Sequence, residues 1–401
     1  MKTTKRSQFN FTSCFRSPRR TTAWAMLCLA LCMLGLGLSA MAQQPPIITF
    51  DAPNAGKEAG QGTFPWGIIQ GGWVMGDYID AKGVYHGFLR APDGFITEFE
   101  PPEAGSEAGQ GAGWVWGMNP ALEIVGAVAD SSNVLRGFLR TFQGKFTLFE
   151  AGPALGVTSV VTDVEGVNPA GVILGDFLDA NDIYHGYLRS PDGTITQFDP
   201  PDAGSVPGSY QGTYPAIFEG INPAGITVGE YLDSSYVWHS YLRDPAGHFT
   251  EFDPTGPVGS GVASSGTVGI NPAGEIAGWY FDTNFVFHGY VRAPDGQITE
   301  YDVPGSGTLE YQGTNACWYI SCFGGINSAG MIAESYADEK NVYHGYMRTS
   351  EGKFFVFDVP AAGKGAWQGT QATAINPEGQ ITGYYTDENN VVHGFLRLAI
   401  P

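Results

Sequence analysis

A five-residue pattern, His-Gly-aromatic-aliphatic-Arg with small variations, recurs seven times along this chain and constrains its fold more than any other feature. The seven copies begin at His86, Arg136, His185, His239, His288, His344 and His393. They are 50, 49, 54, 49, 56 and 49 residues apart. A period of this length indicates a repeat protein, in which each unit buries its apolar face against its neighbours.

Each unit is predicted to contain four short strands joined by turns. The fifth unit, for example, has Gly-Ile-Asn-Pro-Ala-Gly from Gly269, a strand-like run to Asp282, the anchor pattern, a Pro-Asp-Gly turn and a run from Ile298 to Asp302. Asn-Pro-x-Gly and Pro-Asp-Gly are turn sequences, and no segment shows the periodicity of an amphipathic helix. Four-stranded units at this spacing are typical of propeller blades, so we predict an all-β, seven-bladed β-propeller.

The two ends of the chain predict how the blades close into a ring. The last unit stops at Pro401 without its fourth strand, whereas the run from Ile47 to Asp51 matches the fourth-strand sequence from Ile195 to Asp199. We predict that this N-terminal strand completes the last blade, which would remove the open edges of the array. Residues 43–401 would then form a single propeller domain, and we expect a monomer.

The first 42 residues differ from the rest of the chain. Six basic residues precede an apolar run from Ala23 to Leu38 and the small-residue site Ala40-Met41-Ala42, which is the pattern of a signal peptide. Its removal before Gln43 leaves 14 Lys and Arg against 40 Asp and Glu, a formal charge of −26. This charge argues against nucleic acid and anionic membranes as partners. We predict a secreted or periplasmic bacterial protein.

The repeat resembles the HAF family of extracellular bacterial repeats. The resemblance rests on His-Gly-Phe/Tyr, on the Asn-Pro-x-Gly-x-Ile before it and on the Asp-Gly turn after it, and covers essentially all of the mature chain. Gly, and once Ser, stands where the family name has Ala. The resemblance implies export and repeat architecture, and it is silent on ligand and chemistry.

An Asp precedes each anchor by six residues, and we predict that it faces the anchor residue directly across a hairpin as a structural clip. The pairs are Asp80 with His86, Asp179 with His185, Asp233 with His239, Asp282 with His288, Asp338 with His344 and Asp387 with His393, with Arg136 opposite Asp130 in the second unit. Because sevenfold repetition spreads these histidines around a ring, we expect no metal site built from them. The anchor Arg is interpreted as a tie between blades.

The acidic hairpins leave calcium as an alternative to the absence of any cofactor. The run from Asp179 to Asp182 supplies some oxygen ligands. It lacks the Gly and the final Glu of an EF-hand loop. We therefore expect no cofactor.

Positions that break the repeat are better candidates for a functional site. Just before Gly-Ile-Asn, successive units carry Trp66, Trp116, Glu165, Glu219, Val268, Gly324 and Thr373. Trp66 and Trp116 could stack on a sugar ring. Glu165 and Glu219 are candidate catalytic residues, because paired carboxylates hydrolyse glycosidic bonds. The alternative is that the tryptophans fill space between blades while the glutamates meet solvent or the ring of Arg.

The sixth unit enlarges the loop that enters its blade. Cys317 and Cys322 are the only cysteines after the signal peptide, and we predict a disulfide between them in an oxidising compartment. This bond would present Trp318 and Tyr319 as further ligand-binding candidates on a rigid tip, the alternative being a pinned surface loop. The loops between units share one rim with the Asp-bearing hairpins, and we expect a ligand on that rim.

The common catalytic motifs are absent from the sequence. The leading hypothesis is a secreted scaffold that binds polysaccharide or a surface protein. One alternative is a carbohydrate-active lyase or hydrolase with its site at the propeller mouth. Another is a purely structural exported protein.

Overall fold

Short β-strands make up almost all regular structure in the computed structural model, which describes residues 45–255, 262–315 and 323–399. One helical turn, α2 (Ala151–Ala154), interrupts the strands in this part of the chain. The prediction of an all-β fold is confirmed. Two predictions fall outside the described residues. These are the predicted signal peptide and the loop that contains Cys317, Trp318, Tyr319 and Cys322.

None of the helices in the described ranges is long and apolar enough to cross a membrane.

Each anchor pattern forms the third strand of its unit. The third strands are β4 (Tyr85–Arg90), β8 (Leu135–Arg140), β13 (Tyr184–Arg189), β17 (Trp238–Arg243), β21 (Phe287–Arg292), β26 (Tyr343–Arg348) and β30 (Val392–Arg397). The second strands, which pair with them, are β3 (Val74–Ile79), β7 (Ile124–Ala129), β12 (Ile173–Asp179), β16 (Thr227–Leu232), β20 (Ile276–Asp282), β25 (Ile332–Ala337) and β29 (Ile381–Thr386).

The first and fourth strands flank this central pair. First-strand segments are β2 (Gly62–Ile68), β6 (Gly117–Met118), β10 (Ser159–Thr162) with β11 (Gly166–Val167), β15 (Gly212–Pro215), β19 (Val262–Ile270), β23 (Gly313–Thr314) with β24 (Gly325–Ile326), and β28 (Gly369–Ile375). Fourth strands are β5 (Ile96–Phe99), β9 (Phe146–Phe149), β14 (Ile195–Phe198), β18 (Phe249–Phe252), β22 (Ile298–Tyr301) and β27 (Phe354–Phe357).

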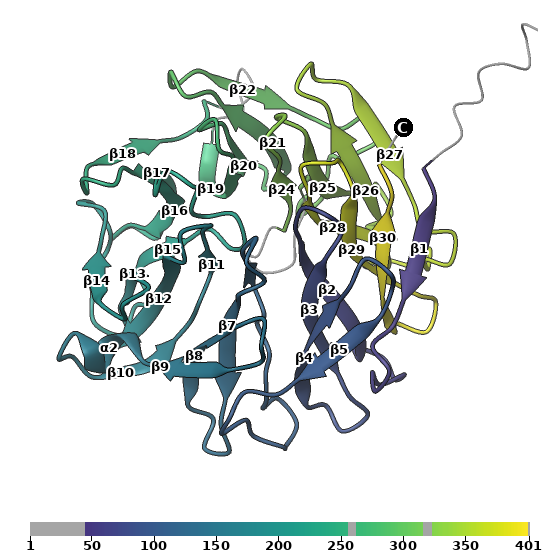
Figure 1. The fold of residues 1–401 in the computed structure, drawn as a ribbon. Coiled ribbons are helices and arrows are strands. Elements are labelled where there is room, and N and C mark those ends of the chain that lie inside the picture. Colours follow the sequence, from purple (N-terminus) through teal and green to yellow (C-terminus); the bar gives the residue numbers. More distant parts are fainter. Residues whose placement is uncertain (1–44, 256–261, 316–322, 400–401) are drawn as a thin grey trace, which may run out of the picture. The chain divides into compact units, whose positions relative to one another are not determined.

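The last unit takes its fourth strand from the other end of the chain. Strand β1 (Ile47–Phe50) pairs antiparallel with β30, so that Ile47 lies opposite Arg397 and Phe50 opposite Gly394. Figure 1 shows β1, in purple, beside β30, in yellow. The N-terminal strand therefore lies where the sequence predicts it.

A chain of asparagine side chains links the units in order. The Nδ2 group of each turn Asn donates to the backbone carbonyl at the same position of the next unit, in the series Asn119, Asn168, Asn222, Asn271, Asn327 and Asn376. The last of these, Asn376, donates to the carbonyl of Ile69 in the first unit at 3.2 Å. The order of neighbouring units thus closes on itself.

The anchor arginines form a second set of links between units. Each guanidinium lies 4.7–5.0 Å from the centre of an aromatic ring on the fourth strand of the preceding unit. Arg90 of the first unit lies over Phe50 of β1, so this series also closes. Cation–π contacts of this kind contribute about 0.5–2 kcal/mol each.

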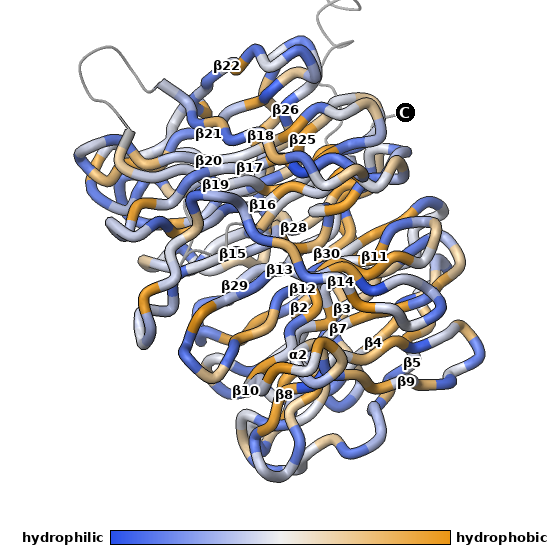
Figure 2. The backbone as a smooth tube through the Cα atoms, turned by 90° about the vertical axis from the view of Figure 1, so that its left-hand side faces the viewer, coloured by the Kyte–Doolittle hydropathy of each residue, from blue (hydrophilic) through white to orange (hydrophobic). Residues whose placement is uncertain are grey.

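The aromatic residue of each anchor pattern is the centre of its unit's core. Phe88, Phe138, Tyr187, Tyr241, Tyr290, Tyr346 and Phe395 are all fully buried. The preceding Gly is required by a close approach, since a Cβ on Gly87 would lie 2.1 Å from the ring of Phe99. Figure 2 shows hydrophobic residues along the strands and hydrophilic residues at many of the turns between them.

Candidate functional site

A cavity of about 250 Å³ lies between the first and second units. Its lining residues are Phe64, Trp66, Asp77, Ile79, Tyr85, Trp114, Trp116 and Phe323. Trp66 and Trp116, the two tryptophans that the sequence singles out, both contribute to it. Six aromatic side chains therefore surround a space large enough for one sugar ring.

Local backbone irregularity places one of these aromatic residues. The second unit has five residues between Gly111 and Gly117, where the first has four between Gly62 and Gly67, and Trp114 lies in this longer stretch with a φ of 54°. Its ring stacks on Tyr85 at 5.7 Å and 16°. A left-handed backbone is rare for a bulky residue, and such strain is concentrated at functional sites.

Among the described residues that line the cavity, Asp77 is the only one whose side chain has a carboxyl or amino group. Its Oδ2 accepts a hydrogen bond from Trp66 Nε1 at 2.8 Å, and the side chain is 3% exposed. Burial raises the pKa of Asp77 to about 7. Sequence reasoning missed this residue. The equivalent position holds Asp176 and Glu230 in the third and fourth units, and Ala127 and Trp279 in the second and fifth.

Two phenylalanines from distant units pack on the same tryptophan. The ring of Phe323 lies 4.8 Å from that of Trp66, and the ring of Phe218 lies 6.0 Å from it. Phe218 also contacts Trp116 at 6.2 Å. Both phenylalanines follow insertions in the first-strand segments of the fourth and sixth units, which is why the repeat pattern did not reveal them.

Glu165 lies in a different environment from the two tryptophans. Burial raises the pKa of Glu165 well above its usual range, and the neighbouring carboxylates of Asp163 and Asp176 raise it further. Its Oε2 has no hydrogen-bond partner among the described residues. Glu230 of the fourth unit is also close enough to raise this pKa.

Glu219 reaches across to another unit. Its Oε2 accepts a hydrogen bond from the backbone N–H of Ile326 at 2.7 Å, and burial raises its pKa to about 8. Neither Glu165 nor Glu219 lines the tryptophan cavity. The structure therefore does not bring these two carboxylates together with Trp66 and Trp116 in one site.

The repeated Asp and His side chains interact, but not in the predicted register. His86 lies opposite Tyr78, whereas Asp80 is opposite Val84 and its Oδ1 accepts the N–H groups of Lys82 and Val84. The prediction of direct opposition is wrong, because three residues of the turn separate Asp80 from Val84. Asp and His still share one face and meet diagonally, with His Nε2 to Asp Oδ2 distances of 3.4–4.0 Å in six units.

Each anchor His also contacts a second acid that the sequence analysis missed. This acid follows the fourth strand, 14 residues after the anchor His in five units: Glu100, Asp199, Asp253, Asp302 and Asp358. In the last unit Asp51, after β1, takes this place at 3.0 Å from His393 Nδ1. Arg136 makes the equivalent contacts with Asp130 at 2.5 Å and Glu150 at 2.8 Å.

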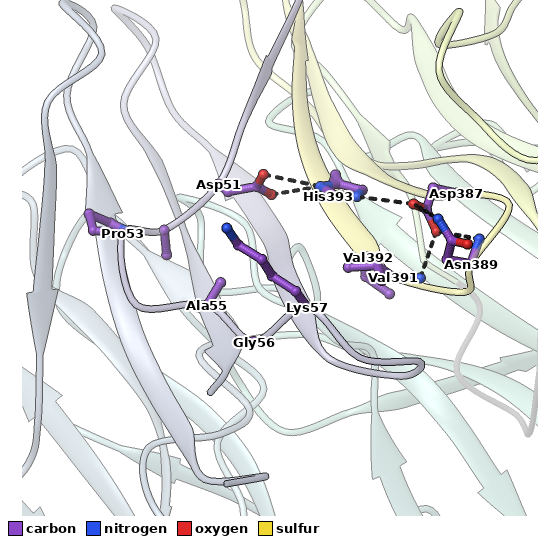
Figure 3. A pocket seen from close by; sticks show the side chains of 11 residues that line it. Asp51, Pro53, Ala55, Gly56, Lys57, Asp387, Asn389, Val391, Val392 and His393 are labelled. Carbon is purple, nitrogen blue, oxygen red and sulfur yellow. Dashed lines mark hydrogen bonds and ion pairs between the residues drawn. The ribbon is translucent and has the colours of Figure 1, made fainter. Parts of the chain in front are cut away.

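These clips line surface pockets at the outer part of two units. Figure 3 shows His393 between Asp51 and Asp387, with Lys57 beside them, in a pocket of about 560 Å³. An equivalent pocket of about 330 Å³ surrounds His344, Asp358 and Lys364. The polar groups here are engaged with one another, so these pockets are weaker candidates than the aromatic cavity.

The described ranges contain no group of three or more His, Cys, Asp or Glu arranged to hold a metal ion. The acidic hairpin at Asp179 instead uses its carboxylate to cap its own turn, accepting from Asn181 and Ile183. The proposed ligand-binding residues Trp318 and Tyr319, and the disulfide between Cys317 and Cys322, fall in the segment that the structure does not describe.

No family model matches the sequence, and no curated protein matches it. Among solved structures, the chain is similar to a prolyl endopeptidase, with a TM-score of 0.45 and 11% identity over 92% of this chain and 60% of that one. It is also similar to AofleA of Arthrobotrys oligospora (TM-score 0.44, 10% identity, 79% and 90% covered). A third is the six-bladed fucose-binding lectin of Aleuria aurantia (TM-score 0.40, 15% identity, 73% and 92% covered). The chain thus spans under two thirds of the prolyl endopeptidase, and similarity this low indicates no function.

Proposed function

We propose that this protein is a secreted, seven-bladed β-propeller of the HAF type that binds carbohydrate, with the aromatic cavity of the first two units as its site. The observation that carries the proposal is the lining of this cavity by the partly exposed rings of Tyr85, Trp114 and Trp116, with the buried Trp66 and Asp77 behind them. Aromatic faces stack on the apolar face of a sugar ring, and a carboxylate accepts hydrogen bonds from its hydroxyls.

The closed order of seven repeat units supports the blade count within this proposal. The Asn series and the Arg series each return to the first unit, at Ile69 and Arg90 respectively. Export through residues 1–42 to the periplasm or the exterior would place the site among cell-surface or environmental polysaccharides.

Binding is favoured over hydrolysis by the number of acids in the cavity. A glycosidase of the usual kind needs two carboxyl groups about 5–9.5 Å apart on either side of the scissile bond. The cavity holds one, Asp77, and the candidates Glu165 and Glu219 do not line it.

A glycan array probed with residues 43–401 tests this function, followed by titration calorimetry on each glycan that binds. Trp114→Gly suits the positive φ of this position and removes one stacking face, so we expect affinity to fall by roughly tenfold. The melting temperature should fall because the stacking on Tyr85 is lost, and calorimetry is therefore done well below it. Phe95→Thr is the matched control, because Phe95 is an exposed aromatic residue outside the cavity. Absence of binding to any glycan, equal affinity of W114G and wild type, or turnover of a bound glycan would contradict the proposal.

A further inference from the structure

Five exposed aromatic side chains occupy turn positions that favour glycine or asparagine. Tyr236 and Phe285 lie at hairpin tips between second and third strands, with φ values of 63° and 59°. Other units place Gly83, Asn133, Asp182, Asn341 and Asn390 at this tip. Because the left-handed conformation is unfavourable for a bulky residue, an aromatic ring there is not explained by the turn itself.

The loops between units also have aromatic residues at positions with a positive φ. Tyr210, Tyr311 and Trp367 precede the Gln of their loops with positive φ, where the first two units have Gly60 and Gly109. The loop residue donates its N–H to the carbonyl of the neighbouring hairpin tip, as Tyr311 does to Phe285 at 2.8 Å. The two kinds of tip are therefore adjacent, and the rings of Phe285 and Tyr311 lie 6.2 Å apart.

We refer to Tyr210, Tyr236, Phe285, Tyr311 and Trp367 as the tip aromatics. Their exposed fractions are 53%, 60%, 45%, 51% and 37%. Tyr210 lies in the loop between the third and fourth units, Tyr236 and Phe285 lie in the fourth and fifth units, and Tyr311 and Trp367 lie in later loops. The first two units have Gly at the loop position. One side of the rim thus has exposed aromatic residues at these turn positions, and the other has Gly or Asn there.

The charge around four of the five tip aromatics is one-sided. The segments 205–215, 233–238, 282–287 and 305–312 contain no Lys or Arg, whereas Lys340 and Lys364 lie near Trp367 in the sequence or across the hydrogen bond to Asn341. Asp182, Asp233 and Glu310 lie in or next to the four tips that lack basic residues. Acidic groups between aromatic faces suit a ligand that carries both sugar rings and positive charge.

We propose that the tip aromatics form a second carbohydrate-binding surface, which takes an extended polysaccharide rich in amino sugars. Its rings stack on successive tip aromatics, and its ammonium groups lie beside the carboxylates. This surface is separate from the tryptophan cavity, because none of the tip aromatics lines it.

Titration calorimetry of residues 43–401 with a glucosamine hexamer at pH 6 tests this proposal. The double variant Y236N/F285N installs the residue that three other units already have, so the fold loses strain. We expect its affinity to fall roughly tenfold or more, with an unchanged or higher melting temperature. Phe95→Thr removes an exposed ring elsewhere and should leave affinity unchanged.

Comparison ligands decide between this class and others. An N-acetylated hexamer and a uronic acid hexamer should bind more weakly than the glucosamine hexamer, and the uronic acid hexamer weakest. Equal binding of all three hexamers, no binding of the glucosamine hexamer, or full affinity of Y236N/F285N would overturn the proposal. If W114G lost affinity and Y236N/F285N did not, the glucosamine hexamer would bind in the cavity, and this result would also overturn the proposal.

Discussion

The contact between the first and second units and the contact between the third and fourth units use the same repeat positions for opposite chemistry. The first contact has Tyr85 before the anchor, Asp77 in the second strand and Trp66 in the first strand. At the same positions, the other contact has Tyr184, Asp176 and Glu165. Tyr85 stacks on Trp114 at 5.7 Å, and Tyr184 contacts Tyr214 at 4.6 Å. The tyrosine and the second-strand acid are therefore shared. The first strands differ at two positions, with Phe64 and Trp66 against Asp163 and Glu165, and the next unit supplies Ala127 at one contact and Glu230 at the other.

These differences change how protons are held. At the first contact Asp77 is a solitary acid, and Trp66 donates a hydrogen bond to it. At the other contact Glu165 is buried near Asp163, Asp176 and Glu230, and burial followed by the neighbouring acids raises its pKa well above the usual range. A tryptophan leaves a cavity with one titratable group, whereas a glutamate produces a cluster of carboxyl groups that must hold protons to stay buried.

The largest expected effect of the buried carboxyl groups is on the pH dependence of stability. Burial raises the pKa of Glu230 and Glu219 to about 8, of Asp77 to about 7 and of Asp163 to about 6. A carboxyl group with a raised pKa in the folded state stabilises the fold fully below its unfolded pKa. This stabilisation is lost as pH rises through the folded value. We expect the free energy of unfolding to be greater at pH 5 than at pH 8.5, by about 3 kcal/mol or more.

Urea denaturation of residues 43–401 at half-unit steps from pH 4 to pH 9 measures this dependence. Below about pH 4 stability should fall again, because backbone hydrogen bonds and the nearby His lower the pKa of turn acids such as Asp80 and Asp338. A free energy that is flat or rising between pH 5 and pH 8.5 would show that the buried acids keep their ordinary pKa values.

The second prediction isolates the acidic contact. Glu165→Gln removes one buried carboxyl group and supplies an amide that can donate to Asp176, so stability at pH 8 should rise by about 2 kcal/mol. At pH 5, where the carboxyl group is protonated already, the change should be small. Thermal melts at both pH values check this difference.

Asp77→Asn is the matched control at the other contact. The amide oxygen keeps an acceptor for Trp66 Nε1, and no second carboxylate lines this cavity. The gain at pH 8 should therefore be smaller, about 1 kcal/mol. Equal gains from E165Q and D77N would mean that the neighbouring acids of Glu165 contribute nothing.

The sequence predicts the parts of this molecule that repeat, and it loses accuracy where the repeat is interrupted. The closing strand β1 and the convergence of Trp66 and Trp116 follow from pattern alone, because every unit offers the same template. The direct opposition of Asp80 and His86 failed because turn length sets the register, and the turn is three residues long. Phe218 and Phe323 lie in insertions whose path no neighbouring unit specifies.

Two of the buried acids, Asp77 and Asp176, were missed for a different reason. Glu165 was recognised by its departure from the repeat, but Asp77 and Asp176 alternate along strands as solvent-facing acids would. Only the packing of the next unit over them shows that both are buried. Charge burial depends on which strand faces which neighbour, and that information is not present within one unit.

The smallest expected effect concerns the repeated Asp–His clips. Because units at both contacts have such a clip, its effect on stability is a baseline against which the two contacts are compared. The hydrogen bond that His393 donates to the Asp51 carboxylate raises the pKa of His393, burial opposes this, and the pKa is raised overall. A His with a raised pKa stabilises the fold below about pH 6.5, and this stabilisation is lost as pH rises through the folded value. His393→Gln should therefore lower the free energy of unfolding by about 0.5 kcal/mol at pH 5.5 and leave it unchanged at pH 9. Urea titrations at the two pH values measure this difference.

If H393Q were as destabilising at pH 9 as at pH 5.5, the clip would act through packing on Tyr385, whose ring lies 4.9 Å away, and not through charge.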